Sequence, residues 1–119
     1  MAGEPLFATH FFDSLNILCV GGDLDYGAGM VRTSSAGAAW EYTYLGIWGR
    51  ATAISFRTPL EGWAPLGFAG AYMKTRDGGA RWDATPVVGG ASMNDIVFTD
   101  SGTGYMVGSG GTVLKYVGE

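Results

Sequence analysis

The feature that most constrains this chain is an eight-residue turn motif, Thr75-Arg76-Asp77-Gly78-Gly79-Ala80-Arg81-Trp82. Asp favours a tight turn because its carboxylate can accept a hydrogen bond from nearby backbone amides, and Gly tolerates a positive φ. A Trp directly after such a turn offers a large apolar surface that can anchor the turn to a core. The motif therefore predicts a structural turn built on Thr75, Asp77, Gly79 and Trp82.

The same frame occurs earlier in the chain, over residues 33–40. Its last residue, Trp40, precedes Trp82 by 42 residues, and Ser35 stands in the place of Asp77. A Ser hydroxyl can still form a turn hydrogen bond, although a weaker one than a carboxylate. We therefore predict a second, degenerate copy of the turn, with Ser35 and Trp40 in the structural positions.

A longer three-fold repeat runs through the chain. Phe11, Phe56 and Phe98 lie 45 and 42 residues apart, and each is followed by a polar turn and a short apolar run. Alternating apolar and polar residues near these positions favour strands. Each repeat also offers a further short strand that a basic residue closes, and these strands are Gly29–Arg32, Ala71–Lys74 and Thr112–Lys115.

The repeat predicts an all-β chain of consecutive four-stranded antiparallel meanders, about three of them, in a single domain over residues 1–119. We expect repeats at approximately 7–46, 47–90 and 91–119, with the last lacking its fourth strand. The 21 glycines among 119 residues follow no collagen-like period. Such a glycine content, mixed with aromatic and β-branched residues, is typical of short strands joined by tight turns.

The charge and the termini exclude several classes of partner. The formal net charge is −4, which argues against a nucleic-acid partner and against an anionic membrane surface. No apolar run approaches the ~20 residues of a membrane-spanning helix, and the N-terminal residues lack the pattern of a signal peptide. We therefore expect a chain that is cytoplasmic by default, with no membrane partner.

The turn motif resembles the Asp-box (BNR) repeat of β-propellers such as sialidases, sortilin-type receptors and the photosystem II assembly factor family. In those families the Asp caps the turn and the Trp packs beneath it. The string from Gly104 to Lys115 is most similar to repeats of the photosystem II assembly factor type. The resemblance covers about residues 7–119 and implies that each meander is one propeller blade.

The number of repeats leads to a prediction about assembly. Closed propellers contain about four to eight blades, and an open arc would leave strand edges exposed. We predict that the arc closes by self-association into a homodimer with six blades. Residues around Glu4–Ala8 would then add the missing fourth strand to the last blade of the other copy. A fragment of a longer propeller, or a small open meander, stays an alternative.

The connections between blades are the predicted ligand-binding surface. Trp48 and Arg50 lie in a Gly-flanked connection, and Trp and Arg are common anchors of interfaces. The loop that holds Asp23, Asp25 and Tyr26 is expected on the same face, together with residues 88–93. These residues predict a non-catalytic binding or scaffold module for a protein or carbohydrate ligand. Packing of Trp48 between blades is the alternative.

Enzymatic and metal chemistry receive weaker support. Arg57, in Phe56-Arg57-Thr58-Pro59, resembles the Phe-Arg-Ile-Pro motif of sialidases, so a sialidase-like glycoside hydrolase is the alternative function. We assign no catalytic residue, no metal ligand and no cofactor, because His10 has no partner ligand in the sequence. Cys19 lies in an apolar run, and we expect a buried core thiol there.

Overall fold

The protein is built entirely from antiparallel strands and turns. The computed structural model describes residues 5–23 and 27–116, and no α-helix occurs in these two ranges. The first sheet contains β1 (Leu6–Phe11), β2 (Ile17–Asp23), β3 (Gly27–Thr33) and β4 (Glu41–Ile47). The second contains β5 (Ser55–Phe56), β6 (Gly62–Pro65), β7 (Ala71–Thr75) and β8 (Asp83–Pro86). The third contains β9 (Met93–Asp100), β10 (Thr103–Gly108) and β11 (Val113–Lys115).

Each sheet is a meander in which every strand pairs with the next one along the chain. Two short 3-10 turns, η1 (Val88–Gly90) and η2 (Ser109–Gly111), lie in connections. The prediction of an all-β chain of antiparallel sheets is therefore confirmed. The repeat bounds at 7–46, 47–90 and 91–119 stay predictions beside these observed strand limits. No helix of the described ranges has the length and apolar character needed to cross a membrane.

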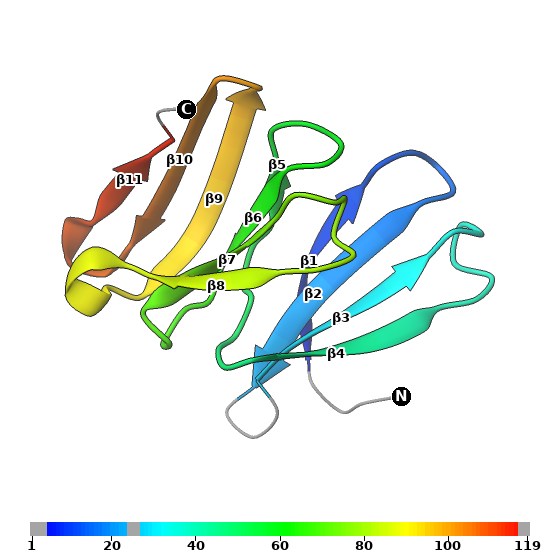
Figure 1. Ribbon diagram of the computed structural model, residues 1–119, viewed down its shortest axis with the longest axis horizontal. Helices are drawn as coiled ribbons and strands as arrows, with labels where there is room; N and C mark the ends of the chain where they lie inside the picture. The colour runs from blue at the N-terminus through cyan, green and yellow to red at the C-terminus, as the bar shows by residue number, and fades with distance from the viewer. Residues whose placement is uncertain (1–4, 24–26, 117–119) are drawn as a thin grey trace.

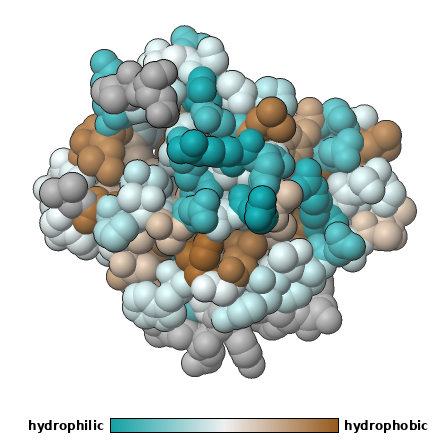
Figure 2. Space-filling model, viewed as in Figure 1, coloured by the Kyte–Doolittle hydropathy of each residue, from teal (hydrophilic) through white to brown (hydrophobic). Residues whose placement is uncertain are grey.

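The three sheets stand side by side, from sheet 1 through sheet 2 to sheet 3 (Figure 1). The molecule extends 40 × 34 × 19 Å. On the face seen down the shortest axis, hydrophilic residues run across the middle and hydrophobic residues form small separate clusters (Figure 2). The larger apolar clusters lie between the sheets instead.

The core between sheets 1 and 2 follows from strand alternation. Side chains of a strand point alternately to its two faces, so Leu18 and Val20 of β2 turn toward sheet 2 and are fully buried. Met73 of β7 and Trp82 reach the same cluster from the other side. Cys19 lies between Leu18 and Val20, points away from sheet 2 and is only half-buried. The expectation of a buried core thiol is therefore wrong.

A second core lies between sheets 2 and 3. Trp63 of β6 is buried there with Met93 and Ile96 of β9 and Met106 of β10. The ring centroids of Trp63 and Phe98 lie 5.0 Å apart. Sheet 2 is therefore covered on both faces, whereas sheets 1 and 3 each have one face that the described residues leave open.

The N-terminal strand has a different place from the one predicted. Leu6 and Ala8 of β1 pair with Gly21 and Val20 of β2, and the Gly22 amide donates to the Pro5 carbonyl at 3.0 Å. Residues 5–8 therefore begin sheet 1 of their own chain. The expectation that they serve as the fourth strand for another copy is wrong, because their β2-facing edge is already hydrogen-bonded. Glu4 lies outside the described residues.

Candidate binding face

One end of the three sheets collects the connections that lead from one sheet to the next. The Arg50 amide donates to the Leu66 carbonyl at 3.0 Å, which ties the β4–β5 connection to the β6–β7 connection. The backbone of Gly27 also lies against this segment, since a Cβ atom there would stand 2.6 Å from the Ile47 carbonyl oxygen. The Gly67 amide donates to the Met93 carbonyl at 3.1 Å, which joins the next connection.

Four side chains at this end form a cluster that we call the aromatic–arginine patch, made of Phe7, Trp48, Arg50 and Phe68. Trp48 packs edge-on against Phe68, with ring centroids 4.7 Å apart. The Arg50 guanidinium carbon lies 5.5 Å from the centre of the Phe68 ring and 5.6 Å from that of Phe7. A guanidinium over an aromatic face is attracted by the ring quadrupole, so these contacts hold the side chain in place.

Trp48 and Arg50 flank a glycine whose backbone packs closely against the β6–β7 connection. Gly49 between them is buried and has a φ of 142°. A Cβ atom on Gly49 would stand 2.8 Å from the Leu66 Cβ atom. Only glycine therefore fits this approach, and of the two residues beside it Trp48 is exposed and Arg50 is half-buried. Trp48 keeps 58% of its surface exposed.

The predicted ligand-binding residues are only partly brought together. Trp48 and Arg50 lie in the patch, and Asp23 ends β2 opposite Gly27, near the same segment. Asp25 and Tyr26 lie outside the described residues. Phe7 and Phe68 were missed by the sequence reasoning. Phe68 offered a weak signal, since it stands in the Gly-flanked run Gly67-Phe68-Ala69-Gly70.

The opposite end of the sheets carries the two turns of the motif. In the β7–β8 turn, the Thr75 hydroxyl donates to Asp77 Oδ1 at 2.9 Å and accepts the Gly79 amide at 2.9 Å. The Asp77 carboxylate also accepts the Arg81 amide at 2.9 Å. This backbone hydrogen bond from Arg81 is the first reason that the pKa of Asp77 is held below its usual value, and the Thr75 hydroxyl adds to it.

The β3–β4 turn repeats these contacts with a hydroxyl in place of the carboxylate. The Thr33 hydroxyl accepts the Gly37 amide at 3.0 Å, and the Ser35 hydroxyl accepts the Ala39 amide at 3.0 Å. The two tryptophans differ more. The Trp82 indole donates to the Gly79 carbonyl at 3.1 Å and the side chain is 8% exposed, whereas Trp40 is 45% exposed. Trp82 has sheet 1 to pack against, and Trp40 lies at the outer side of sheet 1.

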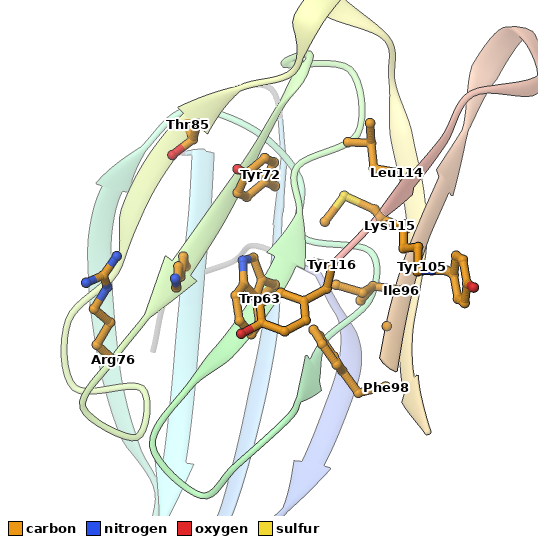
Figure 3. A pocket seen from close by; sticks show the side chains of 13 residues that line it. Trp63, Tyr72, Arg76, Thr85, Ile96, Phe98, Tyr105, Leu114, Lys115 and Tyr116 are labelled. Carbon is orange, nitrogen blue, oxygen red and sulfur yellow. The ribbon is translucent and has the colours of Figure 1, made fainter. Parts of the chain in front are cut away.

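A cavity of about 410 Å³ opens between sheets 2 and 3 (Figure 3). Trp63 and Tyr72 form one wall, and Phe98, Leu114 and Tyr116 form the other. The Lys74 ammonium nitrogen lies 4.7 Å from the centre of the Trp63 ring. The volume is in the range of small-ligand pockets, about 300–1,000 Å³. Nothing in the sequence pattern pointed to this cavity, because it depends on how two sheets pack.

Arg57, the residue of the sialidase-like motif, is engaged in local contacts. Its guanidinium binds the Glu61 carboxylate, donates to the Ser101 carbonyl at 3.0 Å and lies 5.1 Å from the centre of the Tyr116 ring. It belongs to the β5–β6 turn, away from the aromatic–arginine patch. Among the residues that the structure describes, no three His, Cys, Asp or Glu side chains gather as a metal site.

Three adjacent antiparallel meanders define a fold of the propeller class, and comparison with known proteins agrees with it. A solved structure of YCF48 bound to D1 peptide matches with a TM-score of 0.76 and 24% identity, over 94% of this chain and 37% of that one. YCF48 from Cyanidioschyzon merolae matches with a TM-score of 0.76 and 23% identity, over 98% of this chain and 39% of that one.

Sequence comparison points the same way. The chain is 28% identical over 97 residues to photosystem II stability/assembly factor HCF136, chloroplastic, of Arabidopsis thaliana. That match covers 77% of this chain and 24% of the Arabidopsis protein, so the chain spans about a quarter of its relative's length. No protein-family model matches the chain.

Proposed function

We propose that the protein is a non-catalytic, protein-binding module of the propeller type, and that its aromatic–arginine patch contacts the protein ligand. The exposed Trp48 ring, braced by Phe68 beside a guanidinium held between two rings, is the observation that carries this proposal. Trp and Arg dominate the binding energy of protein interfaces. Their pre-positioning lowers the entropic cost of ordering them on binding. A peptide ligand is the first choice because a structural neighbour of this chain binds one.

The test uses a fluorescently labelled D1 peptide as the probe in an anisotropy titration. We expect saturable binding to the wild-type chain, and at least about a 30-fold weaker affinity for Trp48→Ala and Arg50→Ala, as for interface hot spots. Trp40→Ala is the matched control, since Trp40 is also exposed but lies at the opposite end. The proposal fails if the folded wild-type chain does not bind, or if Trp40→Ala weakens binding as much as Trp48→Ala does.

We also infer that the chain self-associates, with the outer face of sheet 3 against sheet 1 of a second copy. By strand register, Tyr105 occupies the place in sheet 3 that Trp63 occupies in sheet 2 and Leu18 in sheet 1. Leu18 and Trp63 are buried under the next sheet, whereas Tyr105 and Val107 are exposed. Sheet 1 of a second copy, in the place of the following sheet, would cover Tyr105 and Val107 in the same way. Two such contacts close a ring under two-fold symmetry.

Light scattering after size exclusion measures this assembly directly. We expect a dimer for the wild-type chain and a monomer for Val107→Glu, because the new carboxylate would be buried without a partner. Leu60→Glu is the control, since Leu60 is also apolar and exposed but lies in the β5–β6 turn. A folded wild-type monomer at high concentration would exclude closure by a second copy.

A further inference from the structure

β4 forms the outer edge of sheet 1 (Figure 1). Within residues 5–23 and 27–116, it pairs with β3 only, and its other edge carries no strand. Sheet 1 already has four strands, as sheet 2 has, so this is the outer edge of a complete sheet. The unpaired edge of a strand presents backbone amide and carbonyl groups that can accept another strand.

The outer edge of sheet 2 is protected against such pairing, whereas that of sheet 1 is not. β8 has four residues, begins with the charged Asp83 and ends at Pro86, which cannot donate to a ladder. β4 has seven residues, contains no proline or lysine and carries one charge, on Glu41. Its Tyr44 side chain is 60% exposed. A long edge strand without protective residues tends to pair with another strand.

The centre of β4 is complementary to itself. Tyr42, Thr43 and Tyr44 read the same in both directions, and their ladder with β3 is regular. If two β4 strands pair antiparallel with Thr43 on a two-fold axis, each Tyr42 lies opposite the Tyr44 of the other copy, and the two Thr43 residues lie opposite each other. Aromatic–aromatic and Thr–Thr pairs are among the cross-strand pairs that stabilise a sheet. Residues 84–86 of β8, Ala-Thr-Pro, lack this symmetry.

The same register brings opposite charges together. Counting along the two strands, Glu41 of one copy comes beside Leu45 of the other. Leu45 lines a groove of about 550 Å³ between β4 and the β7–β8 turn, together with two arginines and two aspartates of sheet 2. Among these, Arg81 has a side chain that is 92% exposed and only a long contact, 3.8 Å, with Asp77. The Glu41 carboxylate of a second copy can therefore pair with Arg81, and two-fold symmetry forms this pair twice.

We propose that two copies of the chain pair side by side through the outer edges of their β4 strands, antiparallel and with Thr43 on the two-fold axis. Backbone hydrogen bonds between the strands join the two copies of sheet 1 into one continuous sheet. The two tyrosine pairs and the two Glu41–Arg81 pairs fix the register. One strand from each copy makes a small contact, and small contacts are weak and transient. We therefore expect the solution mass at micromolar concentrations to stay unchanged by it.

This contact differs from the one proposed for ring closure. Ring closure covers one face of sheet 1 with sheet 3, whereas the side-by-side pair uses the edge of β4. Because the two strands run antiparallel, the aromatic–arginine patches of the two copies lie at opposite ends of the pair, and both stay accessible to a ligand. The edge contact, ring closure and ligand binding use different groups, so a failure of one leaves the others standing.

The test traps the pair as a disulfide between two Thr43→Cys chains. All chains carry Cys19→Ser, which removes the one native thiol, and Val107→Glu, which blocks the proposed ring closure. Residues directly opposite each other have Cβ atoms about 4.5–5.5 Å apart, close to the ~3.5–4.5 Å that a disulfide spans. Thr85→Cys is the matched control, because Thr85 has the equivalent place in β8 and is more exposed. On a non-reducing gel, we expect the covalent dimer of Thr43→Cys to form at least about tenfold faster, because its thiols are already held together.

Further substitutions in the Thr43→Cys chain test the register. Tyr44→Lys places a charge at the edge and should lower the trapping rate to that of the Thr85→Cys control. Arg81→Gln should slow trapping about three- to tenfold, because two ion pairs are lost. The same substitution should have no effect in a Glu41→Gln chain, where the partner of Arg81 is already absent. Circular dichroism checks that every variant is folded.

Three results would contradict the proposal. Equal trapping rates for the folded Thr43→Cys and Thr85→Cys chains would overturn it and leave the edge of β4 to solvent or to a strand of another protein. Trapping that Tyr44→Lys does not slow would mean that the two copies meet in a different geometry. An effect of Arg81→Gln that is equally large in the Glu41→Gln chain would overturn the register, because Arg81 would then act on another group.

Discussion

At the scale of single residues, the two turns show how one motif gives two environments. Thr33 and Thr75 accept equivalent backbone amides, and both are buried. Asp77 and Ser35 cap equivalent amides four residues further on. The hydrogen bonds are thus encoded locally. Burial of the tryptophan depends instead on whether another sheet lies beside it.

The role of Asp77 can be separated from its ion pair with Arg81. Asp77→Ala removes the hydrogen bonds to the Arg81 amide and the Thr75 hydroxyl, and we expect a loss of about 1–2 kcal/mol in the free energy of unfolding. Arg81→Ala removes only a surface contact of 3.8 Å and should cost less than about 0.5 kcal/mol. Urea denaturation measures both values. Equal losses would mean that the ion pair, and not the turn cap, accounts for the contribution of Asp77 to the free energy of unfolding.

His10 gives the stability a pH dependence of defined sign. Burial lowers the pKa of the His10 imidazole below its ordinary value of 6.5, and the ring centroid lies 4.4 Å from that of Phe56. The unfolded chain therefore binds the proton more readily than the folded one. The contribution of His10 is complete above pH 6.5 and is lost as the pH falls through the lower, folded-state pKa. Melting temperatures between pH 7 and pH 5 should fall less for His10→Phe than for the wild type. Parallel curves would contradict this assignment.

At the scale of strands and sheets, a phenylalanine–glycine pair recurs where the first strand meets the second. Phe56 pairs with Gly62 and Phe98 with Gly104. A Cβ atom on Gly62 would stand 2.6 Å from the Phe56 ring, and one on Gly104 would stand 2.3 Å from the Phe98 ring. The missing side chain lets the ring lie across the neighbouring strand and toward the preceding sheet.

The Phe56–Gly62 pair predicts that a larger residue at Gly62 carries a steric cost, which intrinsic strand propensity alone does not predict. Gly62→Ala should lower the free energy of unfolding by about 1–3 kcal/mol, because the methyl group displaces a packed ring. Gly102→Ala is the control, since its Cβ atom would meet only the Asp100 carboxylate at 3.7 Å. Thermal unfolding compares the two. A smaller effect for Gly62→Ala than for Gly102→Ala would show that the Phe56 ring can move aside.

Many of the strands and turns could be predicted from the sequence, because they are determined by local sequence. The strand after Phe11, the Ala71–Lys74 strand and the two turn motifs depend on residues within a few positions of each other, and the structure has strands and turns there. The cavity, the exposure of Cys19 and the patch residues Phe7 and Phe68 depend on how separate sheets pack. One sequence carries no direct signal for such contacts. The place of residues 5–8 was wrongly predicted because the sequence pattern of a strand does not show which other strand it pairs with.

At the scale of the whole molecule, the three sheets are not equally protected. Sheet 2 is covered on both faces, and β2, β3, β6 and β7 lie between other strands. Within residues 5–23 and 27–116, β11 is paired on one edge only. Amide hydrogen exchange follows such differences in local stability. We expect the slowest exchange in β2, β3, β6 and β7 and the fastest strand exchange in β11. Uniform protection across the strands, measured by NMR or mass spectrometry, would mean that the sheets open only together.

The pairing of each strand with the one before it also has a consequence for synthesis on the ribosome. In each sheet of the described ranges, every strand forms its backbone hydrogen bonds with strands that are next to it in the sequence. Sheet 1 has all four strands once Ile47 has been made, and its inner face is then ready before sheet 2 exists. Each completed sheet then provides the face against which the next sheet packs. We therefore expect the chain to fold vectorially, from its N-terminus onward, with little of the kinetic delay that long-range strand pairing imposes.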